Sequence, residues 1–331
     1  MMSLADLFRG RNVLITGGLG FVGSNLAIKL VRCGANVTLL DSLIPQFGGT
    51  FANISTIQQQ VVVNISDMRD ANSLDILVQG KEYIFNLAGQ VSHGDSMRDP
   101  QLDLGVNCVS TMNLVEACRK HNPTARMLYT STRQVYGRPQ KLPVTEDHPT
   151  LPIDVNGINK LAAEYYHLLY HGTYGIRSTV LRMTNTFGPR QQIRSNRQGF
   201  ATIFLRLALR GETISLYGGG NQLRDFNYVD DVVDAMLLAI TNNQCMGQFF
   251  NLGSLTAYSL VQFVEILKKF CKFKVESVPF PEDKRIIDIG DYYGDFSKFQ
   301  AITNWKPRVD LEEGLEKTIA FYREHKEVYW Q

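Results

Sequence analysis

A short glycine-rich segment near the N-terminus limits what this chain can fold into. Val13-Leu14-Ile15 is an apolar run typical of a buried parallel strand. Glycines follow at once, and Phe21–Cys33 then has apolar residues at helical spacing. A strand, a glycine turn and a helix in this order favour a dinucleotide site, because the pyrophosphate sits on N–H groups at the helix N-terminus. The residues expected to hold the dinucleotide here are Gly17, Gly20, Phe21 and Val22.

Acidic residues follow the next two predicted strands. Asn36–Leu40 is apolar and ends in Asp41, about twenty residues beyond the glycine turn. A carboxylate there can accept both ribose hydroxyls of the adenosine and would repel a 2′-phosphate, so we expect NAD and not NADP. The third strand, Gln60–Ile65, is followed by Asp67 and Met68, which we place beside the adenine.

The fourth predicted strand, Tyr83–Leu87, ends in small residues. Backbone contact with the cofactor is expected there, because small side chains leave room for it, and the residues concerned are Leu87, Ala88 and Gly89. After this strand we expect a loop at Val91–Pro100 and one long helix at Gln101–His121.

The strand–helix alternation continues to a sixth strand at Ile176–Arg182. This order predicts an α/β fold, a doubly wound parallel sheet of the Rossmann type with helices on both faces. Beyond Arg182 the pattern is polar and interrupted, which predicts a smaller α/β domain capping the sheet. We expect residues 1–182, with about 226–251, to form the NAD-binding domain, and residues 183–225 and 252–331 to form the substrate domain.

Composition excludes several classes of partner. The net charge is +2, so nothing favours nucleic acid or a membrane surface through bulk charge. No apolar run is long enough to span a bilayer, and the N-terminus lacks the pattern of a signal peptide. The five cysteines are scattered, odd in number and mostly within apolar helical patterns. They indicate a cytoplasmic protein with reduced cysteines and no metal site.

Further motifs occur in a fixed order along nearly the whole chain. They are Gly17-x-x-Gly20-x-x-Gly23, Asp41, Asp67, Leu87-Ala88-Gly89, Asn107, Ser131-Thr132-x-x-Val135-Tyr136-Gly137, Lys160, Arg182-x-x-Asn185-x-x-Gly188-Pro189, Arg224-Asp225 and Trp305-Lys306-Pro307. Jointly they resemble the extended short-chain dehydrogenase/reductase family, specifically its NAD-dependent nucleotide-sugar epimerases and dehydratases. The resemblance implies a nucleotide-diphosphate sugar as substrate and adds Asn107 to the cofactor site.

The resemblance also assigns the catalytic positions. Thr132 would hydrogen-bond the sugar hydroxyl that is oxidised, and Lys160 would hold the nicotinamide ribose and tune the proton transfer. The family's proton acceptor is a Tyr four residues before the Lys, one helical turn away on the same face. Here that position is Asn156. An amide does not titrate, so Asn156 cannot be the general base.

Three explanations remain open for Asn156. Another group takes the proton while Asn156 orients the sugar: Lys160, a water held by Asn156 and Thr132, or a residue of Val91–Arg98, above all His93. Alternatively, the chain binds NAD and a nucleotide sugar without efficient turnover. In the third explanation, a natural Tyr has been replaced.

The residues after Thr132 bear on the reaction type. Dehydratases of this family carry an Asp-Glu pair there, as acid and base, whereas this chain has Arg133-Gln134. Arg133 cannot exchange a proton at neutral pH, so epimerisation is favoured over dehydration or decarboxylation.

Substrate contacts follow from the same resemblance. Arginine binds phosphate oxygens bidentately, and Arg224 and Arg285 match the family's two diphosphate positions. The complete expected substrate set is Gln90, His93, Thr132, Arg133, Asn185, Arg224 and Arg285. Arg190, Arg194 and Arg197 are expected in a solvated basic loop.

Two predicted helices, Gln101–His121 and Asn156–Tyr174, carry more apolar surface than one sheet face can cover. In the family these helices pack against the same pair of a second subunit. We therefore expect a two-fold homodimer.

Overall fold

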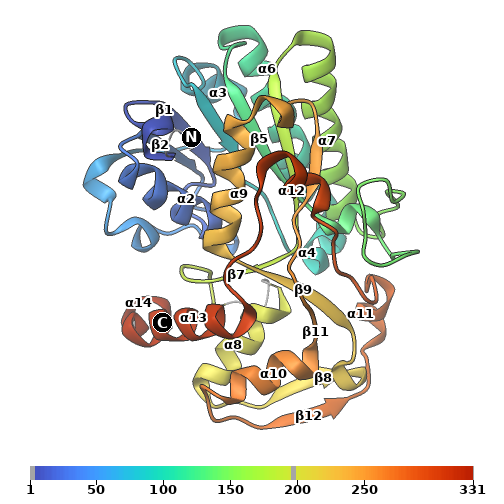
Figure 1. Ribbon diagram of the computed structural model, residues 1–331. Coiled ribbons are helices and arrows are strands. Elements are labelled where there is room, and N and C mark those ends of the chain that lie inside the picture. Colours follow the sequence, from blue (N-terminus) through green and yellow to red (C-terminus); the bar gives the residue numbers. More distant parts are fainter. Residues whose placement is uncertain (1–3, 195–198, 331) are drawn as a thin grey trace.

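The computed structural model describes residues 4–194 and 199–330, so Arg197 lies outside the described residues. Within them, the largest sheet has seven strands in the order β10-β6-β5-β4-β1-β2-β3, and every neighbouring pair is parallel (Figure 1). The strand order changes direction between β1 and β4, which is where doubly wound sheets bind ligands. The predicted Rossmann-type fold is confirmed. Its strands are β1 (Asn12–Thr16), β2 (Asn36–Asp41), β3 (Val61–Ile65), β4 (Tyr83–Asn86), β5 (Arg126–Thr132), β6 (Arg177–Met183) and β10 (Phe249–Asn251).

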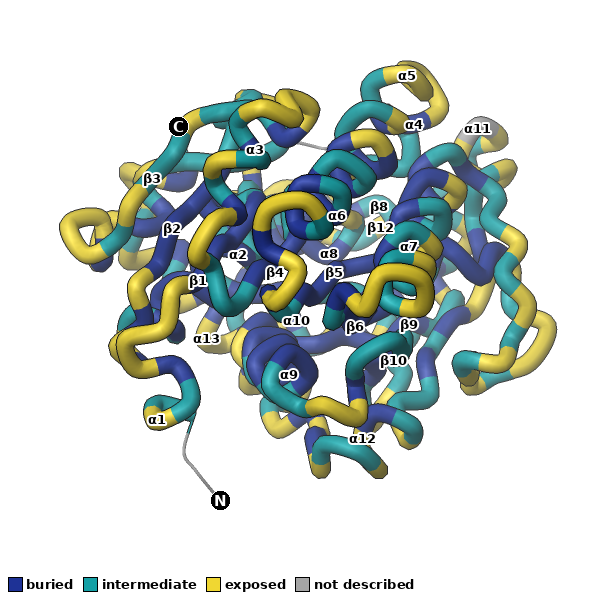
Figure 2. The backbone as a smooth tube through the Cα atoms, turned by 90° about the horizontal axis from the view of Figure 1, so that it is seen from above, coloured by how far each residue is buried: buried dark blue, intermediate teal, exposed yellow. Residues whose placement is uncertain are grey.

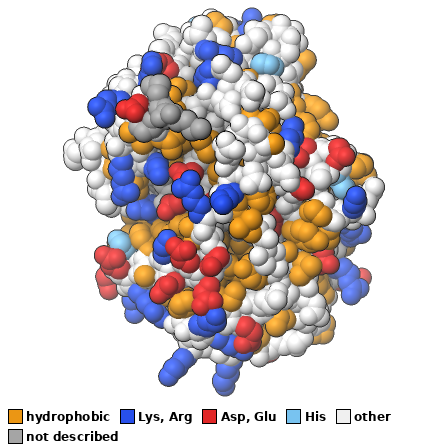
Figure 3. Space-filling view, viewed as in Figure 1, with side chains coloured by type: hydrophobic (Ala, Val, Ile, Leu, Met, Phe, Trp, Pro, Cys, Tyr) orange, Lys and Arg blue, Asp and Glu red, His pale blue; other side chains and the backbone are white. Residues whose placement is uncertain are grey.

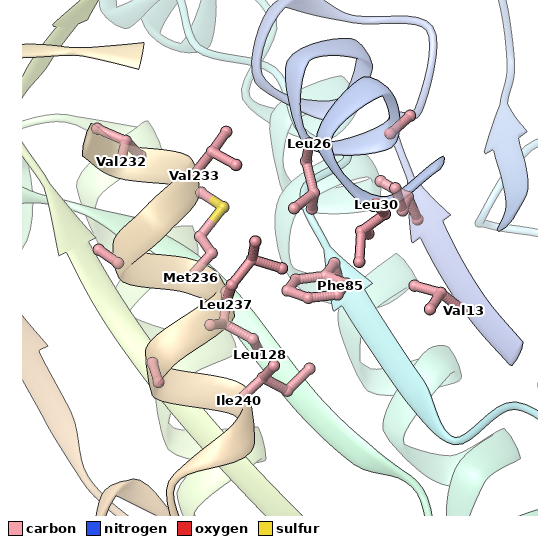
Figure 4. Packing of buried hydrophobic residues seen from close by; sticks show 14 of the residues in the cluster. Val13, Leu26, Leu30, Phe85, Leu128, Val232, Val233, Met236, Leu237 and Ile240 are labelled. Carbon is pink, nitrogen blue, oxygen red and sulfur yellow. The ribbon is translucent and has the colours of Figure 1, made fainter. Parts of the chain in front are cut away.

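Helices cover both faces of this sheet because successive strand residues point to opposite sides. Val13 and Ile15 of β1 belong to one buried cluster, whereas Leu14 belongs to another. Figure 4 shows the first cluster, where Leu26 and Met236 approach the sheet from two helices. The helices of that face are α2 (Phe21–Arg32) and α9 (Val229–Thr241), and those of the other are α3 (Ala71–Leu77), α6 (Ser110–His121) and α7 (Val155–Tyr174).

The expected loop at Val91–Pro100 is wrong, because it contains the helix α4 (His93–Arg98). The Ser92 side chain accepts a hydrogen bond from the Asp95 N–H and so caps its first turn. Asp99 caps the next helix, α5 (Pro100–Asp103), in the same way.

The expected single helix at Gln101–His121 is also wrong. A π-helical turn at Leu104–Val109 lies between α5 and α6. Asn107 of this turn donates its side-chain N–H to the backbone oxygen of Gln90, 3.1 Å away. The wider turn thereby ties the helix to the end of β4, and π-helical turns occur often at functional sites.

A smaller α/β part lies at the carboxyl ends of the central strands and has its own apolar cluster (lower half of Figure 1). It contains a three-stranded sheet, β11-β9-β7, and a two-stranded sheet, β12-β8. These strands are β7 (Asn185–Phe187), β8 (Ile214–Tyr217), β9 (Leu223–Tyr228), β11 (Ala257–Ser259) and β12 (Val275–Val278). The remaining helices of the chain are α1 (Leu4–Phe8), α8 (Phe200–Arg210), α10 (Leu260–Lys268), α11 (Glu282–Ile286), α12 (Ser297–Thr303), α13 (Leu311–Glu324) and α14 (Lys326–Tyr329).

Burial follows the layering. In Figure 2 the central strands β1, β4, β5 and β6 are mostly buried, whereas α6 and α7 expose their outer turns. Figure 3 shows acidic and basic side chains interspersed on one face of the molecule. No helix among the described residues is long and apolar enough to cross a membrane.

Candidate active site

One cavity of about 400 Å³ brings most of the predicted site residues together. It follows the carboxyl ends of the central strands and reaches α8 of the smaller part, so both parts of the chain line it. Sequence reasoning missed the contribution of α8, which supplies Phe200, Ala201 and Thr202 after the glycine at 199. The predicted residues on its wall are Gly17, Gly20, Phe21, Val22, Asp41, Asp67, Met68, Leu87, Ala88, Gly89, His93, Thr132, Arg133, Asn156, Lys160 and Asn185.

The glycine turn needs glycine for steric reasons. Gly17 has φ +65°, and a Cβ there would lie 2.9 Å from the Ala88 Cα. A Cβ on Gly23 would lie 2.2 Å from the Gly17 oxygen. The helix α2 begins after Gly20 with no side-chain cap, so the first N–H groups of the helix remain open to an anion.

Two carboxylates line the cavity near the glycine turn and the ends of β2 and β3. Asp41 accepts hydrogen bonds from the N–H groups of Leu19 (3.0 Å) and Leu43 (2.9 Å). Burial raises the pKa of Asp41, and these backbone hydrogen bonds oppose that rise. Asp67 lies 2.6 Å from the Arg69 guanidinium, which lowers its pKa. Both carboxylates can accept hydrogen bonds from ribose hydroxyls.

Lys160 of α7 is buried between the ends of β4 and β5. Its Nζ donates to the backbone oxygen of Thr130 over 3.2 Å and would lie 3.0 Å from a Cβ on Gly89. Burial lowers the pKa of Lys160 to about 8, although the nearby Asp103 and Glu164 raise it.

The Asn156 amide is held within the fold. Its Nδ2 donates to the backbone oxygen of Gln90 (2.8 Å) and to Oδ2 of Asp103 (3.2 Å). The other oxygen of Asp103 accepts from Nδ2 of Asn159 over 2.7 Å, so the buried carboxylate is paired on both sides. Sequence reasoning missed Asp103 and Asn159. Neither Gln90 nor Asn107 lines the cavity, because both lie behind Gly89.

A second polar group faces the same end of the cavity. Nδ1 of His93 lies 3.1 Å from Oδ2 of Asp154, whose side chain is fully buried. Asp154 caps α7 by accepting from the Gly157 N–H (2.6 Å), and it also accepts from Nε2 of Gln134 (2.8 Å). Burial raises the pKa of Asp154, but His93 and these hydrogen bonds outweigh it and hold the pKa below its usual range.

The predicted diphosphate arginines lie apart from this cavity. Arg224 is buried, donates to the backbone oxygens of Leu223 and Gly290, and lies 3.6 Å from Asp288. Arg285 lines a second cavity of about 350 Å³, together with Tyr217, Gln222 and Gly290.

The expectation of a solvated basic loop is wrong for Arg190. Its guanidinium donates to the Asn53 oxygen (3.1 Å) and the Asn25 side chain (3.0 Å), since the loop packs against α2.

Comparisons with known proteins agree with this geometry. The family model described as GDP-mannose 4,6 dehydratase matches residues 14–318. A putative UDP-glucose 4-epimerase of Methanocaldococcus jannaschii is 32% identical over 310 residues, which cover 93% of this chain and 97% of that protein. The chain belongs to the extended short-chain dehydrogenase/reductase family.

Relatives within this family differ in reaction. UDP-glucuronic acid decarboxylase 1 of Xenopus tropicalis is 30% identical over 328 residues, covering 96% of this chain and 73% of that protein. The structure of a Thermotoga maritima UDP-glucose 4-epimerase with UDP-glucose superposes with a TM-score of 0.87 at 31% identity, covering 95% and 99% of the two chains. The structure of MoeE5 in complex with UDP-glucose and NAD superposes with a TM-score of 0.82 at 28% identity. The match covers 95% of this chain and 99% of that chain.

NAD is the cofactor of this short-chain dehydrogenase/reductase group, and the residues present fit it. The open N-terminus of α2 suits a pyrophosphate, the carboxylates of Asp41 and Asp67 suit an adenosine, and Lys160 suits a ribose at the far end.

Proposed function

We propose that the chain is an NAD-dependent nucleotide-sugar epimerase. One observation carries this choice: the acidic residues on the described wall of the main cavity are Asp41 and Asp67, both at its adenosine end. At the Thr132 end, Arg133 and Gln134 follow the threonine. The side chain of Gln134 donates a hydrogen bond from Nε2 to the carboxylate of Asp154. Elimination of water needs an acid–base pair beside the sugar in addition to the group that takes the proton of the oxidised hydroxyl, and the described wall at this end carries no carboxylate to supply that pair, which favours oxidation and reduction alone.

In this proposal NAD, when bound, accepts a hydride from a ring carbon and returns it to the other face. Thr132 binds the reacting hydroxyl: its Oγ1 already accepts from the Gln134 N–H over 3.3 Å, so its own proton is free to donate. Lys160 supplies positive charge beneath the ribose. Asn156 cannot take a proton, but its Oδ1 can accept a hydrogen bond from a sugar hydroxyl.

The diphosphate and the base are assigned to the smaller part of the chain, which we propose as the substrate domain (residues 183–225 and 252–331). Asn185 lines the main cavity, and its Nδ2 donates to the Asp225 oxygen over 2.9 Å. Arg224 donates to the backbone oxygen of Gly290, and Gly290 and Arg285 both line the second cavity. This supports diphosphate recognition there, since guanidinium groups bind phosphate oxygens in pairs.

We also propose a homodimer and a cytoplasmic location. The outer face of α7 exposes Ile158, Tyr165 and Leu169, and the adjacent π-helical turn exposes Leu104 and Val109. An apolar stripe of this kind suits a second copy of the same helices. All five cysteines are buried and unpaired, as in proteins of reducing compartments.

The test uses the purified full-length chain. Cofactor content is measured after denaturation, and UDP-glucose, UDP-N-acetylglucosamine, UDP-glucuronic acid, dTDP-glucose, GDP-mannose and CDP-glucose are each incubated with the protein and followed by NMR. A stereoisomer of unchanged mass supports the epimerase. A product lighter by one water indicates a dehydratase, and loss of carbon dioxide from UDP-glucuronic acid indicates a decarboxylase.

The second candidate is a non-catalytic NAD and nucleotide-sugar binding protein, which Asn156 favours because the family's usual proton acceptor is absent. Tight binding of NAD and a sugar nucleotide, with no product and no NADH absorbance across the panel, would establish that alternative.

A further inference from the structure

We infer that His93, oriented by Asp154, is the proton acceptor and donor that serves in place of a tyrosine at position 156. This assignment rests on the proposed epimerase function and names the residue that its chemistry lacks. Four observations support it: the anchoring of His93, its contact with Asp154, its open nitrogen, and the engagement of the rival groups.

The backbone of His93 is tied to the N-terminus of α7. His93 is the first residue of α4, which Ser92 caps. Ser96, one turn later, donates its hydroxyl to the His93 oxygen (2.7 Å) and accepts from the Asn156 N–H (3.2 Å). His93 is thereby fixed relative to residue 156, the place where the family carries its acceptor.

The side chain of His93 has the two-sided arrangement of a general base. Nδ1 is buried and lies 3.1 Å from Oδ2 of Asp154. The geometry at Nδ1 falls short of a hydrogen bond, and catalytic hydrogen bonds are often poorly aligned until substrate binds. A carboxylate at Nδ1 selects the tautomer with the proton on Nδ1, which leaves Nε2 as the acceptor.

The other nitrogen of His93 is available. The side chain is 33% exposed and lies on the wall of the cavity that Thr132 also lines. Among residues 4–194 and 199–330, no hydrogen bond engages Nε2 of His93. A sugar hydroxyl held by Thr132 therefore has an imidazole nitrogen within the same cavity.

The other candidate proton acceptors already make hydrogen bonds within the fold. Nδ2 of Asn156 donates hydrogen bonds to the backbone oxygen of Gln90 and to the carboxylate of Asp103. An amide also does not titrate, so Asn156 cannot take a proton. Nζ of Lys160 donates to Thr130, under the backbone of Gly89.

Charged groups surround His93 on several elements. Asp154 is the capping residue before α7, and Lys160 lies in α7. Arg133 comes from the turn after β5, and Asp95 and Arg98 form an ion pair on α4 itself. The fully buried Asp154 is the charge in contact with the ring, so it stabilises the imidazolium that forms.

The hydroxyl O–H bond breaks and its proton passes to Nε2 of His93, while the hydride of the same carbon passes to NAD⁺, leaving a ketone and an imidazolium paired with Asp154. On the return, a hydride re-forms the C–H bond on the other face, and His93 gives the proton back to the oxygen. Proton and electron pair are both recovered, so no co-reactant is consumed.

The experiment compares His93→Gln with the control variant His121→Gln. His121 lies at the outer end of α6, where it pairs with Asp75. Turnover of whichever panel nucleotide the wild type converts is measured from pH 5 to 9, and binding of the nucleoside diphosphate of that sugar (UDP, dTDP, GDP or CDP) is measured by calorimetry. In His93→Gln we expect kcat to fall by about 10²–10⁴-fold, affinity for that nucleoside diphosphate to stay within about threefold, and the acidic limb of the pH profile to disappear. His121→Gln should match the wild type.

Two further variants separate chemistry from structure. Asp154→Asn keeps a helix-capping side chain but removes the charge, so we expect intermediate activity and an intact fold by circular dichroism. Imidazole added to His93→Gly should restore activity in a pH-dependent manner, which a purely structural role would not produce.

The outcomes are distinguishable. If the wild type converts a nucleotide and His93→Gln keeps its rate and pH profile, the assignment of His93 is overturned and the epimerase function stands. Loss of activity together with loss of binding of the matching nucleoside diphosphate, and no rescue by imidazole, also overturns it. If the wild type converts no nucleotide of the panel, the epimerase function fails, and the assignment fails with it.

Discussion

The Asn156 side chain donates to the buried carboxylate of Asp103, with Nδ2 and Oδ2 3.2 Å apart. Asn159, one turn along α7, donates to the other oxygen of the same carboxylate. Each oxygen of Asp103 thus accepts a hydrogen bond from an amide, and the first of these amides also donates to the backbone oxygen of Gln90. The amide at position 156 is therefore matched to its surroundings, which argues against an isolated lesion in an otherwise tyrosine-based site.

We predict that Asn156→Tyr lowers activity and stability. A phenol cannot replace both amide hydrogen bonds, so the Gln90 oxygen and one side of Asp103 lose their donors, at a cost of about 1–3 kcal/mol. Urea denaturation measures the loss, and Thr173→Tyr, at an exposed position in the last turn of the same helix, is the control. A rise in turnover in Asn156→Tyr would instead identify Asn156 as a replaced tyrosine.

The buried Lys160 predicts a specific pH dependence of stability. Its pKa is depressed to about 8 in the folded chain, whereas a free lysine titrates near ~10.4, so the unfolded state binds more protons between these values. The folded chain carries the full cost of the buried charge below pH 8, and this cost disappears as pH rises toward 10. In the absence of added NAD, the stability advantage of Lys160→Met over wild type should therefore shrink from pH 7 to pH 10.

Denaturant titrations at four pH values between 7 and 10 check this prediction. Lys268→Met, at an exposed lysine that pairs with Glu265, is the matched control. Its free energy of unfolding should differ from that of the wild type by nearly the same amount at every pH. If the difference in free energy of unfolding between Lys160→Met and the wild type is also independent of pH, Lys160 is not charged and buried as described.

Local patterns predicted the strand, glycine turn and helix at the start of the fold, because each signal lies within a few residues. The glycine turn is an example, since the spacing from Gly17 to Gly23 reflects one tight turn. The capped helix α4 was missed because Ser92 and Asp99 also suit turns. Asp103 could not be predicted as a partner, because Asn156 and Asn159 lie 53 and 56 residues away and meet it only through packing of α7 against the π-helical turn.

We predict that Gly23→Ala abolishes retention of NAD. The added Cβ would lie 2.2 Å from the Gly17 oxygen, so the turn must open and the N–H groups of α2 lose their alignment toward a pyrophosphate. Gly172→Ala on α7 is the control, since nothing lies within 4 Å of its added Cβ. The measurement is NAD released per chain after denaturation, with folding checked by circular dichroism. Wild-type NAD content in Gly23→Ala would contradict the assigned pyrophosphate site.

The apolar stripe on α7 predicts where the proposed dimer can be broken. Tyr165 and Leu169 are 59% and 57% exposed, and they lie one turn apart on the same face of the helix. In a two-fold interface each stripe meets its own copy, so a single Leu169→Glu substitution places two like charges in the contact. We expect light scattering to show a dimer for the wild type and a monomer for Leu169→Glu. Ile76→Glu on α3, at a residue that is 72% exposed, should remain dimeric. Equal masses for all three proteins would rule out this face as the interface.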